Sequence, residues 1–180
     1  MKAIGVFDEM HAYENCGSIK DFIITKVDYD KKKVIDYFAS FDPSIIGFKV
    51  RKLKDDDKDE HMEIDAIHRI VGTKETVSIP LDEESDGTLK MFALYPLLQD
   101  ALEQGGVLCI DELNARLHPL LVRSFLITFL NPEINKNNAQ IIFTTHDAWQ
   151  LSNNLLRRDE IWFTEKDNTG ASECGGGFGK

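Results

Sequence analysis

The stretch Val107-Leu108-Cys109-Ile110-Asp111-Glu112 decides the fold of this chain. Four consecutive apolar residues have the length of a strand buried on both faces, and two acids follow at once. A second apolar run, Ala139 to Thr145, precedes His146, and Pro119 to Leu130 between the runs has the apolar face of a helix. Strand, helix and strand in this order predict an α/β fold with a parallel sheet.

The same alternation continues toward the carboxyl end. We expect a short helix around Ala148 to Leu156 and a third strand, Glu160 to Thr164, in the same sheet as the first two. A further helix is predicted over Thr88 to Gln104, because apolar residues recur there every three or four positions until Gly105.

The first part of the chain has weaker patterns. Two β-branched-rich runs flank a charged run at 54–60 and predict an antiparallel hairpin with a solvated tip. His68 alternates with apolar residues in the second run, so a structural role is favoured for it. The elements expected here are a strand at Phe22 to Val27, a helix at Lys32 to Phe41, and hairpin strands at Ile45 to Val50 and Met62 to Val71.

Composition limits the class of protein. The chain has 180 residues, of which 42% are apolar, and this is enough for one globular domain. A net charge of −10 argues against a chain-wide nucleic-acid surface. The three cysteines are too far apart to suggest a zinc site or a disulfide framework. Because no stretch resembles a signal peptide or membrane span, we expect a soluble, cytoplasmic protein.

Polar residues follow both central strands, where ligands of open α/β sheets bind. Acids at strand exits are also common as solvated turn residues or helix caps, so one acidic pair alone decides little. Together the residues fit ATP hydrolysis, which needs a held Mg²⁺, an activated water and donors to the γ-phosphate. Asp111 suits Mg²⁺ through water, Glu112 suits the general base, and His146 suits contact with the γ-phosphate.

Glu84-Ser85-Asp86-Gly87-Thr88 stands at the start of the helix predicted from Thr88. Free backbone donors and the helix dipole at such a start favour a phosphate. An ordinary N-cap explains the same residue types, and both interpretations stay open.

At this point the chain resembles a known family. The block from Glu83 to Glu173 is similar to the ABC-type ATPase heads of the AAA-domain superfamily, the group that includes SMC-like proteins. More narrowly, it resembles bacterial AAA-family ATP-binding proteins associated with abortive-infection and restriction loci. The stretches that carry this narrower likeness are Leu113 to Pro119, Arg157 to Asp167 and, further back, Asp42 to Phe48.

The resemblance implies a partial P-loop NTPase sheet with flanking helices and a small antiparallel β region before the signature helix. It implies ATP and Mg²⁺ as ligands, and a second copy or an intact ATPase subunit as partner, with a nuclease or other effector as a further candidate. The implied signature motif, which faces ATP of the opposite subunit, consists of Ser85, Asp86, Gly87 and Thr88. Asp111 and Glu112 correspond to the Walker B pair. The D-loop corresponds to Asn114 to His118, and the switch histidine corresponds to His146.

One part of such a head is missing from the sequence. No segment of the 180 residues has the Walker A pattern Gly-x-x-x-x-Gly-Lys-Ser/Thr, and the glycine-rich tail fails it because Cys174 holds the first glycine position. A truncated or frame-disrupted gene is one explanation. We expect residues 1–20 to be a polar segment of unknown placement, 21–173 to be the carboxy-terminal part of the head, and 174–180 to be a disordered tail.

Three functional hypotheses follow. The chain is an ATP-hydrolysing lobe, or it is a catalytically inactive fragment that acts only as a dimerisation or regulatory module. The third is a metal-dependent hydrolase that uses Asp111, Glu112 and His146 without ATP.

Overall fold

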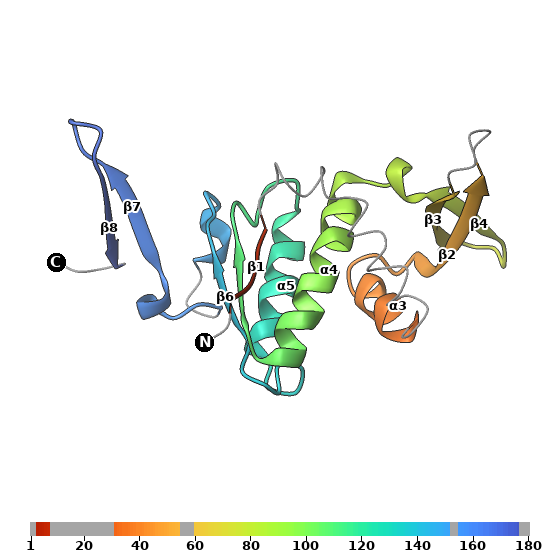
Figure 1. Ribbon diagram of the computed structural model, residues 1–180, viewed down its shortest axis with the longest axis horizontal. Coiled ribbons are helices and arrows are strands. Elements are labelled where there is room, and N and C mark those ends of the chain that lie inside the picture. Colours follow the sequence, from red (N-terminus) through yellow and green to blue (C-terminus); the bar gives the residue numbers. More distant parts are fainter. Residues whose placement is uncertain (1–2, 8–30, 55–59, 152–154, 177–180) are drawn as a thin grey trace.

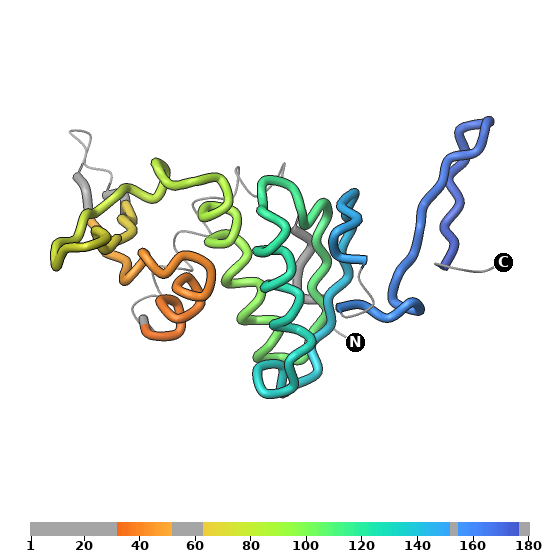
Figure 2. Tube along the Cα trace, turned by 180° about the vertical axis from the view of Figure 1, so that it is seen from behind, coloured from red at the N-terminus to blue at the C-terminus, as the bar shows by residue number. Residues whose placement is uncertain are grey.

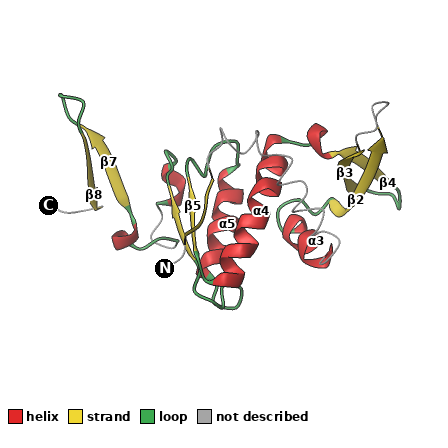
Figure 3. Ribbon diagram, in the orientation of Figure 1, coloured by secondary structure: helices red, strands yellow, loops and turns green. Residues whose placement is uncertain are grey.

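The computed structural model describes residues 3–7, 31–54, 60–151 and 155–176, and its fold class is α/β, as predicted (Figure 3). The helices are α3 (Lys31–Ala39), α4 (Asp86–Gln104) and α5 (Pro119–Leu130), with short 3-10 turns η1 (Leu81–Glu83), η2 (Ala148–Gln150) and η3 (Arg158–Glu160). The strands are β1 (Ala3–Phe7), β2 (Ile45–Lys54), β3 (Glu60–Arg69), β4 (Thr76–Pro80), β5 (Val107–Ile110), β6 (Gln140–Phe143), β7 (Trp162–Lys166) and β8 (Ser172–Gly176).

A three-stranded parallel sheet with the order β1-β5-β6 forms the centre of the molecule. The predicted parallel pairing of the two central runs is therefore confirmed. Helices α4 and α5 lie side by side along this sheet (Figure 1). Leu108 and Ile110 of β5 and their neighbours Ile141 and Phe143 of β6 pack into the hydrophobic core. This arrangement places the ends of β5 and β6 next to each other.

A second, antiparallel sheet has the order β2-β3-β4. The predicted hairpin is present as β2 and β3, while residues 55–59 of its charged tip lie outside the described residues. An aromatic cluster joins this sheet to the helices, because Phe38 of α3 contacts Phe48 of β2 and Phe92 of α4 at ring-centroid distances of 4.9 and 5.6 Å. The sheet is thereby attached to α4.

Both ends of α4 are fixed by identifiable side chains. Ser85 is the N-cap and accepts a hydrogen bond from the Thr88 amide. Gly105 follows the last turn with a φ of 65°, and a Cβ there would lie 2.3 Å from the carbonyl oxygen of Asn137. A side chain is therefore excluded at this position, and glycine ends the helix.

The prediction that Glu160 to Thr164 joins the main sheet is wrong. The strand is Trp162–Lys166, and it pairs with β8 in a separate antiparallel hairpin. All five residues of β7 are exposed, whereas a parallel strand of this kind is normally buried on both faces. Seen from behind, this hairpin and the antiparallel sheet lie at opposite ends of the molecule (Figure 2).

Three further expectations change. Residues 3–7 of the expected unplaced N-terminal segment form β1 beside β5, because the short apolar run Ala3–Phe7 supplies a strand. Residues 174–176 of the expected disordered tail belong to β8, since the antiparallel ladder to β7 satisfies their backbone. Of the helix expected at 148–156, the described residues show the short turn η2, while residues 152–154 and the strand expected at 22–27 lie outside the described residues. Within the described part, no helix has the length and apolarity needed to cross a membrane.

Candidate functional site

The loops that leave β5 and β6 are bound to each other directly beyond the strands. The Leu113 amide donates to the carbonyl oxygen of Thr144 over 3.0 Å, and the Glu112 amide donates to Thr144 Oγ1 over 2.8 Å. The hydroxyl of Thr144 in turn donates to Oδ1 of Asp111. Asp111 and Glu112 are both exposed. The two acids are therefore held by a neighbouring strand end and still reach solvent.

Asn114 connects the first of these loops to His146 in the second. Its side-chain nitrogen lies 3.1 Å from Nε2 and 3.4 Å from Nδ1 of His146, and Thr145 Oγ1 donates to Asn114 Oδ1 over 2.8 Å. Because Oδ1 accepts from the threonine, the amide NH₂ group is turned toward the ring. We call Asp111, Glu112, Asn114, Thr144, Thr145 and His146 the strand-end cluster.

The backbone of the first loop is unusual. Glu112 and Arg116 have φ angles of 46° and 59°, and they are two of the three non-glycine residues with positive φ in the described part of the chain. Such conformations persist where the surroundings hold them, and they gather at functional sites. One holding group is Lys90 of α4, whose ammonium donates to the carbonyl oxygens of Glu112 and Ala115 over 3.0 and 2.9 Å.

The predicted signature residues lie at the start of α4. Ser85 Oγ accepts from the Thr88 amide over 3.1 Å and lies 2.9 Å from Thr88 Oγ1, so these side chains bond to each other and not to the strand-end cluster. Asp86 lies 3.8 Å from Arg116 in an exposed ion pair, which contributes little energy. A Cβ on Gly87 would lie 3.5 Å from the carbonyl oxygen of Arg116. The helix start is therefore next to the loop that carries Glu112.

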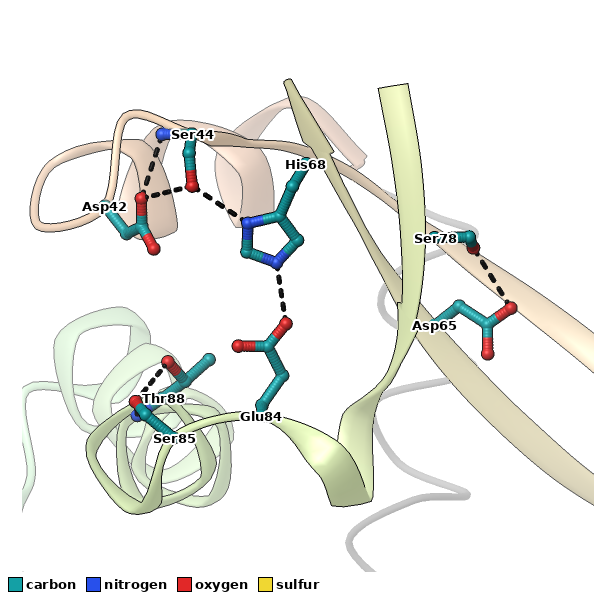
Figure 4. A network of polar contacts seen from close by, with 8 residues as sticks. All are labelled: Asp42, Ser44, Asp65, His68, Ser78, Glu84, Ser85 and Thr88. Carbon is teal, nitrogen blue, oxygen red and sulfur yellow. Dashed lines mark hydrogen bonds and ion pairs between the residues drawn. The ribbon is translucent and has the colours of Figure 1, made fainter. Parts of the chain in front are cut away.

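A partly buried polar network lies just before this helix start (Figure 4). The Ser44 hydroxyl donates to Asp42 over 2.6 Å and lies 2.8 Å from His68 Nδ1, while His68 Nε2 lies 2.6 Å from Glu84 Oε1. The side chains of His68 and Glu84 are only 12% and 7% exposed. We call these four residues the histidine network. It fastens β3 to the residue before Ser85, in agreement with the structural role that the sequence favours for His68.

The antiparallel sheet holds another paired acid. Arg51 Nη2 donates to Asp65 Oδ1 over 2.7 Å, and Ser78 donates to the second carboxylate oxygen over 3.1 Å. The hydrogen bond from Arg51 is the main reason why the pKa of Asp65 is lowered, and the bond from Ser78 lowers it further. This acid is therefore held as a carboxylate by structural partners.

Sequence patterns missed two contributors to the site. The sequence places Thr144 directly before Thr145 and His146 at the end of an apolar run, but it does not predict that the Thr144 hydroxyl connects the two loops. Lys90 was passed over within an amphipathic helix, although it is 4% exposed. Because lysine is almost never buried without partners, this burial needs acceptors, and they come from a loop more than twenty residues further along the chain.

No group of three or more His, Cys, Asp or Glu side chains in the described residues is arranged to hold a metal ion by itself. Mg²⁺ in nucleotide sites is held by one or two carboxylates together with phosphates and waters. The exposed carboxylate of Asp111 fits that ligand pattern.

One family model matches the chain over residues 18–148, a range that contains the helix start, both loops and His146; its description is "AAA domain, putative AbiEii toxin, Type IV TA system". No curated protein matches the chain. Because the family match extends over more than half of the 180 residues, the chain belongs to this AAA-domain family, as an ATPase-like domain of the abortive-infection group.

Proposed function

We propose that the chain is the carboxy-terminal lobe of an ABC/SMC-like ATPase head and takes part in ATP hydrolysis, in a phage-defence setting. The observation that carries this proposal is the strand-end cluster, in which the proposed Walker B acids and switch histidine come from adjacent parallel strands and share Asn114 and Thr144 as connecting groups.

Each residue of the cluster has a role that follows from its chemistry. Glu112 is exposed beyond the strand end and would accept a proton from the attacking water. His146 would donate to the γ-phosphate, with Asn114 fixing the orientation of its ring. Asp111 would hold Mg²⁺ through water, and the ion supplies positive charge near the phosphates when bound. The hydrogen bond from Thr144 orients this carboxylate beforehand.

Ser85, Asp86, Gly87 and Thr88 would contact ATP bound by an opposite subunit. Ser85 and Asp86 are exposed, and the first turn of α4 offers backbone donors and the positive end of the helix dipole. The N-cap bond of Ser85 is compatible with this role, because a hydroxyl that accepts from Thr88 can also donate to a phosphate oxygen. The expected partner is a second copy or an intact ATPase subunit.

A second function is favoured by the lack of a Walker A pattern in the 180 residues. Without that loop, the exposed start of α4 can still complete the ATP site of an intact subunit, and the chain would then act as a dimerisation or regulatory module. Mg²⁺-ATP turnover separates the two. If the chain is a module, it changes the ATP turnover of an intact family member, and this change depends on Ser85 but not on Glu112. If the chain is a catalytic lobe, turnover after a phosphate loop is supplied depends on Glu112 as well.

The isolated chain should bind ATP weakly. Each charge-assisted hydrogen bond to a phosphate is worth about 1.5–3 kcal/mol, and several are missing without the phosphate loop, so we expect a millimolar or weaker dissociation constant. Isothermal titration calorimetry with Mg²⁺-ATP measures it. A micromolar constant for the chain alone would mean that its phosphate cradle is elsewhere, and the proposed division of the head would be wrong.

A further inference from the structure

Lys90 is a buried cation within an apolar part of α4. Its exposed fraction is 4%, and buried residues Met91, Phe92 and Leu94 follow it in the same helix. Lysine is rarely buried to this extent, and its ammonium needs hydrogen-bond acceptors when it is. Two acceptors come from one loop, the carbonyl oxygens of Glu112 and Ala115 at 3.0 and 2.9 Å. The burial of this charge is therefore tied to the shape of that loop.

The same loop has the two left-handed residues Glu112 and Arg116. The Lys90 ammonium lies between the carbonyl oxygens of Glu112 and Ala115, and it favours a loop conformation in which both carbonyls face α4. In that conformation the Glu112 side chain is exposed. In another loop conformation, the ammonium would stay buried with fewer acceptors, which is costly. Lys90 therefore stabilises the conformation that exposes the glutamate.

We propose that Lys90 is a positioning residue: its ammonium holds loop 112–116 in the conformation in which Glu112 and Arg116 are left-handed and the Glu112 side chain is presented, and it links that loop to the start of α4. The link is reinforced nearby, because Asp86 pairs with Arg116 and Gly87 lies close to the Arg116 carbonyl. Displacement of α4 would thus move the acceptors of Lys90 together with the loop.

The functional meaning of this link rests on the proposed function. If Ser85 faces ATP of the opposite subunit and Glu112 serves ATP of its own subunit, Lys90 connects two nucleotide sites through one helix. A partner's nucleotide that shifts the start of α4 would then change how Glu112 is presented. Lys90 itself touches neither nucleotide, and it acts through the Glu112 and Ala115 backbone.

The experiment uses the chain without nucleotide, so it is independent of whether ATP is the ligand. Lys90→Met keeps most of the side-chain volume and removes the donors. Backbone amides of the loop, Leu113, Ala115 and Leu117, are hydrogen-bonded in the structure, and their hydrogen exchange can be compared with that of the β2–β3 ladder. We expect the loop amides to exchange at least about tenfold faster, and the ladder amides to change by less than about threefold.

Two controls separate positioning from general stability. Exposed Lys136→Met removes a lysine charge elsewhere and should leave both sets of amides unchanged. Lys90→Arg keeps the charge and donors and should restore most of the loop protection. A strong intraresidue HN–Hα NOE marks a positive φ, so this NOE of Glu112 reports the left-handed conformation, and we expect it to weaken only in Lys90→Met.

Equal acceleration of loop and ladder amides, or an unchanged intraresidue HN–Hα NOE of Glu112 in Lys90→Met, would overturn the proposal. If Lys90→Met does not fold, Lys90→Gln supplies the same test, because it retains a neutral donor on a shorter side chain. It should then show intermediate loop exchange, and wild-type loop exchange in Lys90→Gln would equally contradict a positioning role.

Discussion

The strand-end cluster and the histidine network both contain acids and a histidine, but their surroundings differ. In the network, His68 and Glu84 are largely buried against each other, and β3 is fastened to Glu84, the residue before the N-cap of α4. In the cluster, Glu112 and His146 are exposed, and Glu112 lies on a loop whose left-handed backbone is held by neighbouring groups. Paired, buried polar groups stabilise a fold, whereas exposed groups on a constrained loop are available to a ligand. The two histidines therefore differ in burial and in hydrogen-bond partners, although their residue type is the same.

The largest expected effect is at the boundary between the two regions. Ser85→Arg adds a bulky cation where a partner's nucleotide should approach the start of α4, so ATP-dependent association with an intact family member should be lost. Removal of the N-cap by itself costs only about 1 kcal/mol of stability. Mass photometry with and without ATP, together with thermal denaturation, measures both quantities.

Ser85→Asp is the matched variant for that experiment. Aspartate is a good N-cap, so stability should stay near that of the wild type, but its charge repels a phosphate and association should still fail. If Ser85→Asp still associates with the intact family member in the presence of ATP, and Ser85→Arg is merely less stable, Ser85 is only a helix cap. It then has a structural role, like the residues of the histidine network.

The next effect compares two glutamates. Glu84→Ala leaves the largely buried Nε2 of His68 without its partner, and we expect a loss of about 1–3 kcal/mol in the free energy of unfolding. Glu112→Ala changes an exposed side chain and should cost within about 0.5 kcal/mol. Urea denaturation of both variants gives the comparison. An equal loss of unfolding free energy in the two variants would contradict the distinction between Glu84 as a structural acid and Glu112 as a functional one.

The smallest effect is a pH dependence from Asp65. Because the pKa of this carboxyl is lowered in the folded state by Arg51, its contribution is present above the unfolded pKa of about 3.9 and is lost as pH falls through the folded value. Asp65→Asn should therefore flatten the acid decline of stability, as urea midpoints between about pH 6 and 3 would reveal. Glu63→Gln, at a more exposed partner of Arg51, is the control and should keep the decline.

Much of the central fold follows from the sequence. The continuous apolar run Val107–Ile110 predicts the buried strand β5. The run from Ala139 to Thr145 likewise predicts β6, but Gln140 and Ile142 are exposed, so this strand is covered on one face only. Their polar exits could then be expected at one edge of the sheet. The start of α4 was equally readable, because Ser85 caps it.

Other features were beyond such patterns. The pairing of β7 with β8 depends on a glycine-rich segment that lacks β propensity, and the position of β1 depends on a contact more than one hundred residues away in sequence. The bond from Lys90 to the Glu112 loop is a tertiary contact between a helix and a turn, and no local period encodes it. Sequence could therefore name the candidate residues but not how the loop is held.

The most direct test of the account is turnover by a hybrid in which the phosphate-loop lobe of an intact family member is supplied to this chain. In Glu112→Gln, shape is kept and the general base is removed, so Mg²⁺-ATP should still bind while hydrolysis falls by about 10²–10⁴-fold. Exposed Glu133→Gln is the matched control and should turn over like the parent. Unchanged hydrolysis in Glu112→Gln, with Mg²⁺-ATP bound, would contradict the assignment of the strand-end cluster as the ATP-hydrolysing site.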